Sequence, residues 1–214
     1  MVKTIVHLLR HGEVHNPDQI LYGRIPGFGL SVRGKEMAQR VADYFGAQNV
    51  HPSGLISSPL QRAVETATPL SEKLDLEIGI DERFIEPTNY FEGKTFGVGD
   101  GSLRHPEHWK YLINPFKPSW GEAYKSQVAR MHAGIHAARK QYEGQEVVIV
   151  SHQLPIWIAR SAFEGRKLWH DPRKRQCSLA SLTSLEFSGD TFTGLHYHEP
   201  AADLLPGASK VAGA

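Results

Sequence analysis

The sequence contains a single cysteine and no long apolar run, and each scarcity excludes a class of protein. Cys177 is the only cysteine among 214 residues, so no disulfide can form within the chain, and export to an oxidising compartment is not implied. No apolar run approaches the roughly 20 residues that a membrane-spanning helix needs. The apolar stretch between Lys3 and Arg10 is too short for a signal peptide. We therefore expect a cytoplasmic protein that does not enter a membrane.

An excess of charge of either sign is also missing. The chain has 24 Lys and Arg against 23 Asp and Glu, which gives a formal net charge of +1. Nothing in this balance favours nucleic acid or an anionic membrane surface as a partner. Hydrophobic residues make up 40% and charged residues 22% of the chain, as in globular proteins generally, and the length permits one or two domains.

Strand and helix patterns alternate along the chain, and no internal repeat is present. Apolar runs that predict strands occur at residues 4–9, 55–57, 76–80 and 146–151. Helical patterns cover residues 31–46, 58–74, 121–142 and 154–163. A hairpin is expected at residues 181–187 and 192–197. This alternation predicts an α/β fold with a mostly parallel central sheet that is covered by helices on both faces.

The start of the second predicted helix carries several local signals. Ser58 is a suitable N-cap, Pro59 suits the first helical position, and Gln61 completes a capping box. We therefore expect this helix to begin directly after Ser58.

Residues 87–120 differ from the rest because they are rich in glycine, proline and aromatic residues. We expect them to form a lid-like insertion of irregular or short helical structure within a single domain that spans residues 1–199. The Ala- and Gly-rich residues 200–214 are expected to form a flexible C-terminal tail.

The most informative motif is Arg10-His11-Gly12, which follows the first predicted strand. Arginine presents a planar fork of donors that matches phosphate oxygens. Histidine can act as a nucleophile or an acid–base group near neutral pH, and glycine lets an anion approach the backbone. The combination predicts phosphate chemistry on His11. The alternative is an ordinary histidine at the end of a strand.

Two further residues are expected beside this motif. His152 follows another apolar strand pattern, and Arg62 lies in the first turn of a predicted helix. Because the carboxyl ends of parallel strands share one edge of a sheet, both should converge on Arg10 and His11. Such a set can neutralise the oxygens of a phosphoryl group while a neutral imidazole attacks phosphorus. The alternatives are a buried, hydrogen-bonded His152 and a solvated Arg62.

Two acidic residues are candidates for the proton donor that a leaving alkoxide needs. Glu86 and Glu13 can each serve if burial raises the pKa of the carboxyl group. The loop that contains Gly23 and Arg24 can reach a bound substrate, although a solvent-exposed Arg24 is an equal alternative.

Two pairs of histidines have spacings that zinc ligands can adopt. His105 and His108 are three residues apart, and His196 and His198 alternate on one predicted strand. No cysteine or acidic triad accompanies either pair, so surface histidines are the preferred interpretation and no metal site is expected.

Three blocks of the sequence, taken together, carry a family resemblance. They are Leu9-Arg10-His11-Gly12-Glu13 with Asn16, Ser57-Ser58-Pro59-Leu60-Gln61-Arg62-Ala63 with Thr66-Ala67, and Val150-Ser151-His152. In their order and approximate spacing, over about the first 190 residues, they resemble the histidine phosphatase superfamily, the phosphoglycerate-mutase-like proteins. The resemblance implies a three-layer α/β/α fold without a metal requirement.

The resemblance also implies roles for individual residues. His11 matches the phosphorylated nucleophile, and Glu86 matches the acid. Asn16 matches a position that lines the pocket, and Gly121-Glu122 matches a pair that opens a helix after the variable insertion. The phosphate pocket is implied to consist of Arg10, Arg62 and His152.

The chain departs from the cofactor-dependent mutases of this family in two respects. Asn89 stands three residues after Glu86, where those mutases usually have a tyrosine. Their pair of adjacent arginines is absent, since the cations of the insertion are Lys94, Arg104, Lys110 and Lys117.

These departures favour a phosphomonoester hydrolase, without a cofactor, that acts on a small phosphorylated metabolite through a phosphohistidine. A phosphoglycerate-mutase-type phosphotransferase is the second interpretation. A non-catalytic phospho-ligand-binding protein is the third, and the complete set of candidate residues speaks against it. The oligomeric state, a homodimer included, is left open.

Overall fold

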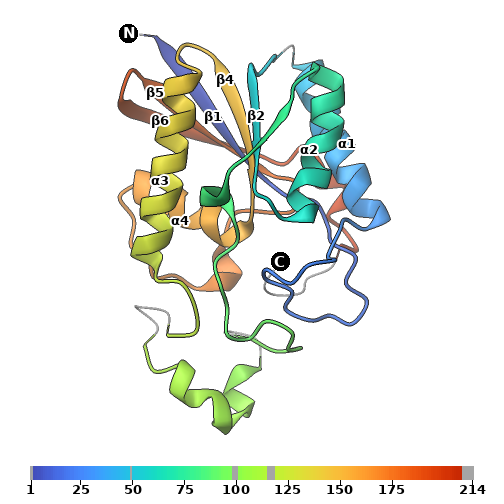
Figure 1. The fold of residues 1–214 in the computed structure, drawn as a ribbon, viewed down its shortest axis with the longest axis vertical. Helices are drawn as coiled ribbons and strands as arrows, with labels where there is room; N and C mark the ends of the chain where they lie inside the picture. Colours follow the sequence, from blue (N-terminus) through green and yellow to red (C-terminus); the bar gives the residue numbers. More distant parts are fainter. Residues whose placement is uncertain (1, 49, 98–100, 115–118, 209–214) are drawn as a thin grey trace.

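The centre of the molecule is a six-stranded sheet, shown in Figure 1 by a computed structural model that describes residues 2–48, 50–97, 101–114 and 119–208. The strands are β1 (Lys3–Arg10), β2 (Gly54–Ser57), β3 (Ile78–Ile80), β4 (Glu146–Ser151), β5 (Leu182–Ser188) and β6 (Thr191–His198). They lie in the order β3-β2-β4-β1-β5-β6. The first four strands along the chain are parallel, β5 is antiparallel to β1, and β6 is antiparallel to β5. The prediction of a mostly parallel sheet is confirmed.

Two pairs of helices cover the two faces of the sheet. One layer consists of α1 (Val32–Ala47) and α2 (Gln61–Leu74), and the other of α3 (Tyr124–Gln141) and α4 (Gln153–Phe163) (Figure 1). Short 3₁₀ helices span Glu82–Phe84, Ser102–Arg104, Pro106–Tyr111, Pro172–Lys174 and Ala202–Leu204. The three-layer α/β/α architecture is therefore also confirmed.

The central strands are apolar throughout because both of their faces are covered. In β4, Val147 and Ile149 belong to the core beneath α3 and α4, whereas Val148 and Val150 belong to the core beneath α1 and α2. None of these four side chains has exposed surface. Alternate residues of one strand thus fill both cores, as expected for a strand buried on both sides.

The parallel strands end at one edge of the sheet and so deliver the residues that follow them to one place. Strand pairing sets Arg10 opposite Ser151 and Ser57 opposite Val150. The turn after β1 is fixed by a close backbone approach, because a Cβ atom on Gly34 of α1 would lie 1.9 Å from the carbonyl oxygen of Glu13. The packing of α1 therefore determines the path of the chain directly after His11.

The start of α2 differs from the prediction. The helix begins at Gln61, its N-cap is Leu60, and no side chain caps it. The hydroxyl of Ser58, expected to cap the helix, is instead hydrogen-bonded to Nε2 of His152 at 2.8 Å. Gln61 does not reach back to form a capping box, because its amide donates to Glu65 at 2.6 Å. The hydrogen bond between Ser58 and His152 thus replaces the helix cap that the local sequence pattern predicts for Ser58.

The insertion lies at the end of the molecule away from the N-terminus (Figure 1). Its described residues contain two short 3₁₀ helices and irregular chain, as expected. A backbone bridge between Asn89 and Gly121 joins the two ends of the insertion. A Cβ atom on Gly121 would lie 2.2 Å from the carbonyl oxygen of Thr88, so the two chains touch there. Residues 98–100 and 115–118, which include Lys117, lie outside the described residues.

The expectation of a flexible tail is wrong for residues 200–208. Ala201 is 1% exposed, and Leu204 and Leu205 pack against the core beneath α1 and α2. Asp203 pairs with Arg40 of α1 at 3.2 Å. Apolar contacts thus hold this segment on the domain, while residues 209–214 lie outside the described residues.

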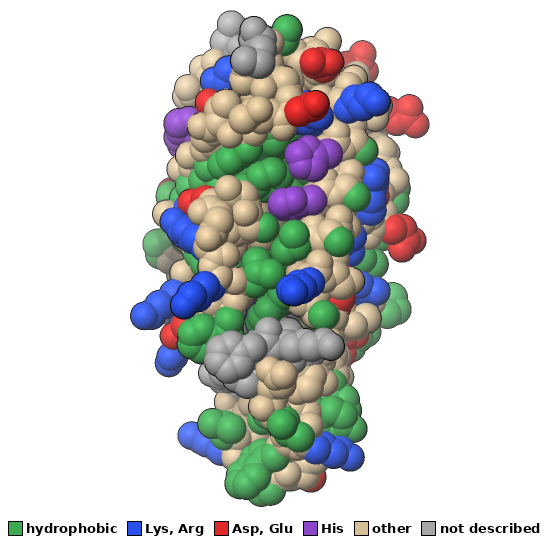
Figure 2. Space-filling view, turned by 90° about the vertical axis from the view of Figure 1, so that its left-hand side faces the viewer, with side chains coloured by type: hydrophobic (Ala, Val, Ile, Leu, Met, Phe, Trp, Pro, Cys, Tyr) green, Lys and Arg blue, Asp and Glu red, His purple; other side chains and the backbone are tan. Residues whose placement is uncertain are grey.

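The surface carries charged side chains of both signs. Figure 2 shows one face, on which basic, acidic and apolar side chains are all present and the insertion projects below the body of the molecule. Within the part of the chain that the structure describes, no helix is long and apolar enough to cross a membrane.

Candidate active site

Four of the predicted site residues come together at the edge where the parallel strands end. Arg10 ends β1, His11 follows it, His152 follows β4, and Arg62 lies in the first turn of α2. All four are buried, and both histidines have no exposed surface. The centres of the two imidazole rings are 5.1 Å apart. The topology thus produces a compact cluster of two guanidinium groups and two imidazoles.

The orientation of His11 is set by the backbone. Its Nδ1 lies 2.8 Å from the carbonyl oxygen of Gly12, which can only accept, so Nδ1 carries the proton. Nε2 therefore holds the lone pair, and this buried atom has no hydrogen-bond partner in the described chain. Burial, followed by the charges of Arg62 and Arg10, holds the pKa of His11 well below its usual value of 6.5. The ring is neutral at physiological pH, and its Nε2 can act as a nucleophile.

Each of the two arginines donates a hydrogen bond to a main-chain carbonyl oxygen. Nη1 of Arg10 donates to the carbonyl of Cys177, and Nη2 of Arg62 donates to the carbonyl of Gly23, each at 2.7 Å. The guanidinium of Arg62 also lies 4.7 Å from the ring centre of Tyr22. Its Nε atom is buried without a partner among the described residues. These contacts orient both guanidinium groups, and Nε of Arg62 remains available to donate to an anion.

Glu86 lies against His152 and has an unusual pKa. Its Oε2 is 3.6 Å from Nδ1 of His152. Burial raises the pKa of Glu86 to about 7, although nearby arginines, chiefly Arg62 and Arg175, act in the opposite direction. A carboxyl group with this pKa can donate a proton and take one back near neutral pH.

Glu13, the other candidate proton donor, has a structural contact instead. Its Oε2 accepts a hydrogen bond from the hydroxyl of Ser31 at 2.5 Å, and Ser31 in turn caps α1 through the N–H of Gly34 at 2.9 Å. Glu13 thus holds the start of α1, whereas Glu86 is the carboxyl group beside His152.

The remaining predicted residues shape the loops around this cluster. Asn16 closes its own loop, because its Nδ2 donates to the carbonyl of Ile20 at 2.8 Å and its Oδ1 accepts from the N–H of Ile20. Arg24 donates from Nε to the carbonyl of Glu86 at 2.5 Å. Gly23 both lines the adjoining pocket and accepts from Arg62. Arg24 therefore positions the backbone of the proposed acid and is not a freely solvated side chain.

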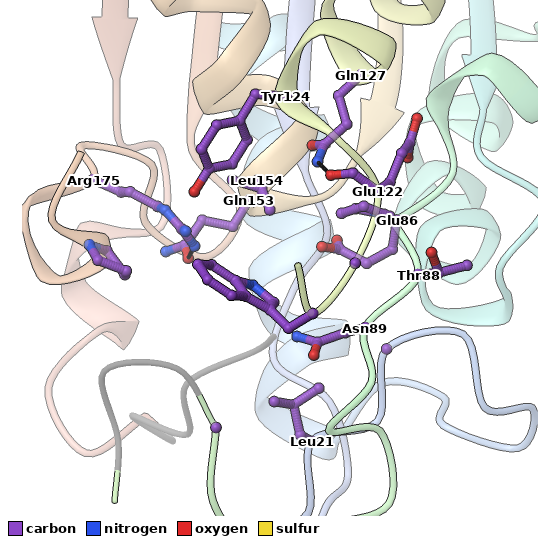
Figure 3. Close-up of a pocket in the computed structure, with 16 residues that line it drawn as sticks. Leu21, Glu86, Thr88, Asn89, Glu122, Tyr124, Gln127, Gln153, Leu154 and Arg175 are labelled. Carbon is purple, nitrogen blue, oxygen red and sulfur yellow. Dashed lines mark hydrogen bonds between the residues drawn. The ribbon is translucent and has the colours of Figure 1, made fainter. Parts of the chain in front are cut away.

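A pocket adjoins Glu86 and extends toward the base of the insertion (Figure 3). Its lining includes several residues that the sequence analysis missed, namely Trp120, Tyr124, Gln127, Gln153 and Arg175. Arg175 belongs to the run Arg173-Lys174-Arg175, which in the sequence resembles any solvated group of charges. No local signal separates the inward-facing Arg175 from its two neighbours.

The histidine pairs considered as zinc ligands lie away from this cluster. His105 stacks on Phe96 with ring centres 3.8 Å apart, and His196 lies 3.3 Å from Glu186. In the described ranges, no group of three or more His, Cys, Asp or Glu side chains is arranged to hold a metal ion.

Comparison with known proteins places this chain in a family. The model of the histidine phosphatase superfamily (branch 1) matches residues 6–200. The uncharacterized protein Rv0525 of Mycobacterium tuberculosis is 50% identical over 200 residues, which cover 94% of this chain and 98% of that protein. Phosphoserine phosphatase 1 of Hydrogenobacter thermophilus is 32% identical over 185 residues, which cover 79% of this chain and 81% of the relative.

Solved structures share the same architecture. Bacillus stearothermophilus YhfR has a TM-score of 0.72 at 26% identity, with 89% of this chain and 94% of the other covered. Mycobacterial glucosyl-3-phosphoglycerate phosphatase Rv2419c has a TM-score of 0.70 at 22% identity, with coverage of 92% and 96%, and so has the same fold. By its sequence and its architecture, the chain belongs to the histidine phosphatase superfamily, branch 1.

Proposed function

We propose that the protein hydrolyses a small phosphorylated metabolite through a phosphohistidine formed on Nε2 of His11. The observation that carries the proposal is the state of this atom, a buried, neutral imidazole nitrogen without a hydrogen-bond partner in the described chain. It lies in a cluster with Arg10 and Arg62, whose charges suit a phosphoryl group. The phosphatase relatives support the same reaction class.

The first half of the reaction transfers the phosphoryl group to the enzyme. Nε2 of His11 attacks phosphorus in line with the ester oxygen, so that a nitrogen–phosphorus bond forms as the phosphorus–oxygen bond breaks. Arg10, Arg62 and His152 stabilise the charge on the equatorial oxygens. The protonated carboxyl of Glu86 gives its proton to the leaving alkoxide, which departs as an alcohol.

The second half restores the enzyme. Glu86, now a carboxylate, accepts a proton from a water molecule whose oxygen attacks phosphorus. The nitrogen–phosphorus bond breaks, inorganic phosphate leaves, and the lone pair returns to Nε2 of His11. Glu86 is again protonated, so the cycle closes without a metal or a cofactor.

Hydrolysis, rather than return of the phosphoryl group to a second hydroxyl, is favoured by the insertion. It contains no pair of adjacent arginines, and Asn89 occupies the position of the mutase tyrosine. Asn89 instead uses its side chain to accept from the N–H of Phe91 at 3.0 Å, which closes a turn.

The test replaces His11 by alanine and measures release of phosphate from p-nitrophenyl phosphate and from a panel of phosphorylated metabolites. His11→Ala is expected to abolish turnover, and rapid acid-free quenching of the wild type should trap an acid-labile phosphoryl group on His11. His196→Ala serves as control, since that side chain is 60% exposed on β6. Retained turnover in His11→Ala contradicts the nucleophile. Isomerised product without free phosphate identifies a phosphotransferase, and binding without turnover by the wild type identifies a ligand-binding protein.

A further inference from the structure

Arg175 is a half-buried cation that the reaction on His11 does not use. It follows the 3₁₀ helix Pro172–Lys174 and lines the pocket that also contains Glu86. Figure 3 shows its side chain extending into this pocket beside Tyr124 and Gln153, with the carboxyl of Glu86 on the facing side. Burial lowers the pKa of Arg175, although its guanidinium remains charged at any physiological pH.

The guanidinium is held in place by neutral groups. Its Nε donates to Nε2 of His170 at 2.8 Å, and its Nη1 donates to Oε1 of Gln153 at 3.2 Å. His170 can accept because its other nitrogen, Nδ1, donates to the carbonyl of Leu168 at 2.7 Å. The side chain is therefore oriented without being neutralised.

Two other arginines of the same layer, Arg130 and Arg160, are paired with carboxylates, unlike Arg175. Arg130 forms three hydrogen bonds with the carboxylate of Glu122, and Arg160 pairs with Glu164 at 3.2 Å. Among the described residues, no carboxylate lies within 4.0 Å of Arg175. A half-buried cation without an anionic partner is partly desolvated, and an anionic ligand in the pocket would offset that cost.

Glu86 does not supply the missing charge during the reaction. In the proposed mechanism it must be protonated when the substrate binds, so it is neutral at that point. Arg10 and Arg62 balance two negative charges of a bound phosphoryl group. Arg175 is then a positive charge in the pocket of Glu86 for which neither the phosphoryl group nor the acid accounts.

The position of Glu86 also determines which part of a substrate meets Arg175. Glu86 contacts His152, which lies beside His11, and at the same time lines the pocket that contains Arg175. Because Glu86 protonates the ester oxygen, the leaving group must lie next to it. The leaving group therefore occupies the pocket of Arg175.

We propose that Arg175 is a specificity-determining residue that binds a second anionic group, a carboxylate or a second phosphate, on the leaving group of the substrate. The proposal rests on the proposed function, and it defines the substrate class as phosphomonoesters with an additional anion. The oxygen pair of either anion matches the planar fork of an arginine.

The test compares substrates that differ only in the second anion. They are 3-phosphoglycerate, glycerol 1,3-bisphosphate and glycerol 3-phosphate, of which the last has no second anion and the first two distinguish carboxylate from phosphate. Wild-type kcat/KM should be higher for at least one of the first two than for glycerol 3-phosphate. Arg175→Met should lower that value about 10- to 100-fold, mainly through KM, because a charge-assisted hydrogen bond is lost. Glycerol 3-phosphate and p-nitrophenyl phosphate should change less than about threefold.

Two further variants separate a binding role from a structural one. Arg173→Met is the matched control, because that side chain is 81% exposed, and it should alter no substrate. Arg175→Lys keeps the charge and should restore part of the preference. An equal loss on every substrate, or a wild type that does not distinguish them, overturns the proposal.

A binding measurement keeps this outcome separate from failure of the proposed function. The affinity of 3-phosphoglycerate and of glycerol 1,3-bisphosphate is measured by calorimetry in His11→Ala and in His11→Ala/Arg175→Met, neither of which needs to turn over. Weaker binding in the double variant supports the subsite even if the protein proves not to be a phosphatase. Unchanged binding of both ligands overturns the subsite, even if His11 is shown to be phosphorylated.

Discussion

Oε2 of Glu86 lies 3.6 Å from Nδ1 of His152, and neither atom has a hydrogen-bond partner in the described chain. This pair joins two parts of the site, since His152 lies in the cluster with His11 and the two arginines, and Glu86 lines the adjoining pocket. Nε2 of His152 is already hydrogen-bonded to the hydroxyl of Ser58, so its Nδ1 faces the carboxyl group of Glu86. In the proposed mechanism, this contact places the carboxyl of Glu86 beside the residues that hold the phosphoryl group.

Replacement of Glu86 by glutamine should affect substrates according to their leaving groups. Glu86→Gln removes the transferable proton, so kcat for alkyl phosphates is expected to fall about 10²- to 10⁴-fold. p-Nitrophenyl phosphate should lose less than about tenfold, because nitrophenolate leaves with little protonation. Steady-state kinetics on both substrates measure the difference.

Two carboxylate variants serve as controls for this experiment. Glu82→Gln alters an exposed neighbour and should leave both substrates unaffected. Glu13→Gln disturbs the cap of α1 and should reduce thermal stability without changing the dependence on the leaving group. The assignment of Glu86 fails if Glu13→Gln, and not Glu86→Gln, selectively impairs alkyl esters.

The pH dependence of phosphoenzyme formation should reflect the raised pKa of Glu86. Because the protonated carboxyl is the active form in this step, the single-turnover rate for an alkyl phosphate should decline as pH rises through about 7. Well above the pKa, the decline should approach about tenfold per pH unit. Burial holds the pKa of His11 well below its usual value, so titration of His11 is not expected to cause this alkaline decline. Glu86→Gln should lack the alkaline decline, and a decline that persists in this variant would assign it to another group.

Gly34 should not tolerate a side chain. In Gly34→Ala, the new Cβ would meet the backbone of Glu13 at 1.9 Å, and a backbone atom cannot move aside as a flexible side chain can. We expect a loss of about 2 kcal/mol or more in the free energy of unfolding, together with reduced turnover, because α1 is pushed from the turn after His11. Gly79→Ala is the control, since its Cβ would make an ordinary 3.7 Å contact with the carbonyl of Leu55. Urea denaturation measures both variants, and equal stabilities would contradict the close approach.

Removal of divalent metals should leave activity intact. The proposed charge stabilisation comes from Arg10 and Arg62, which are permanently protonated. Dialysis against excess EDTA is therefore expected to change kcat on p-nitrophenyl phosphate by less than about twofold, while a zinc-dependent phosphatase treated in parallel loses activity. Activity that disappears with EDTA and returns with zinc would revive the histidine pairs as ligands.

The architecture and the convergence of Arg10, His11, Arg62 and His152 could be predicted from the sequence because the ends of parallel strands are a strong signal. β1, β2 and β4 are short apolar runs, and parallel pairing brings the residues after them to one edge whatever the loops do. That rule alone places His11, His152 and Arg62 together. It needs no knowledge of how the side chains pack.

The errors occurred where tertiary contacts override local patterns. Ser58 has all the attributes of an N-cap, but His152 offers its hydroxyl a buried partner, and the helix starts three residues later. Ala201 belongs to a segment that resembles a tail, yet an apolar surface beneath α1 binds it. Arg175 is indistinguishable from Arg173 in the sequence, and it is directed inward by its hydrogen bonds to His170 and Gln153.

The acceptor that orients His11 is a main-chain carbonyl, and every amino acid supplies one. Where a carboxylate side chain orients a catalytic histidine, a single substitution can leave the wrong nitrogen protonated. In this protein no substitution can delete the oxygen of residue 12, so the tautomer of His11 with its proton on Nδ1 survives any change that preserves the turn. Variants with a misoriented nucleophile should therefore arise only from displacement of the backbone, and the vulnerable positions are the glycines that let two chain segments touch.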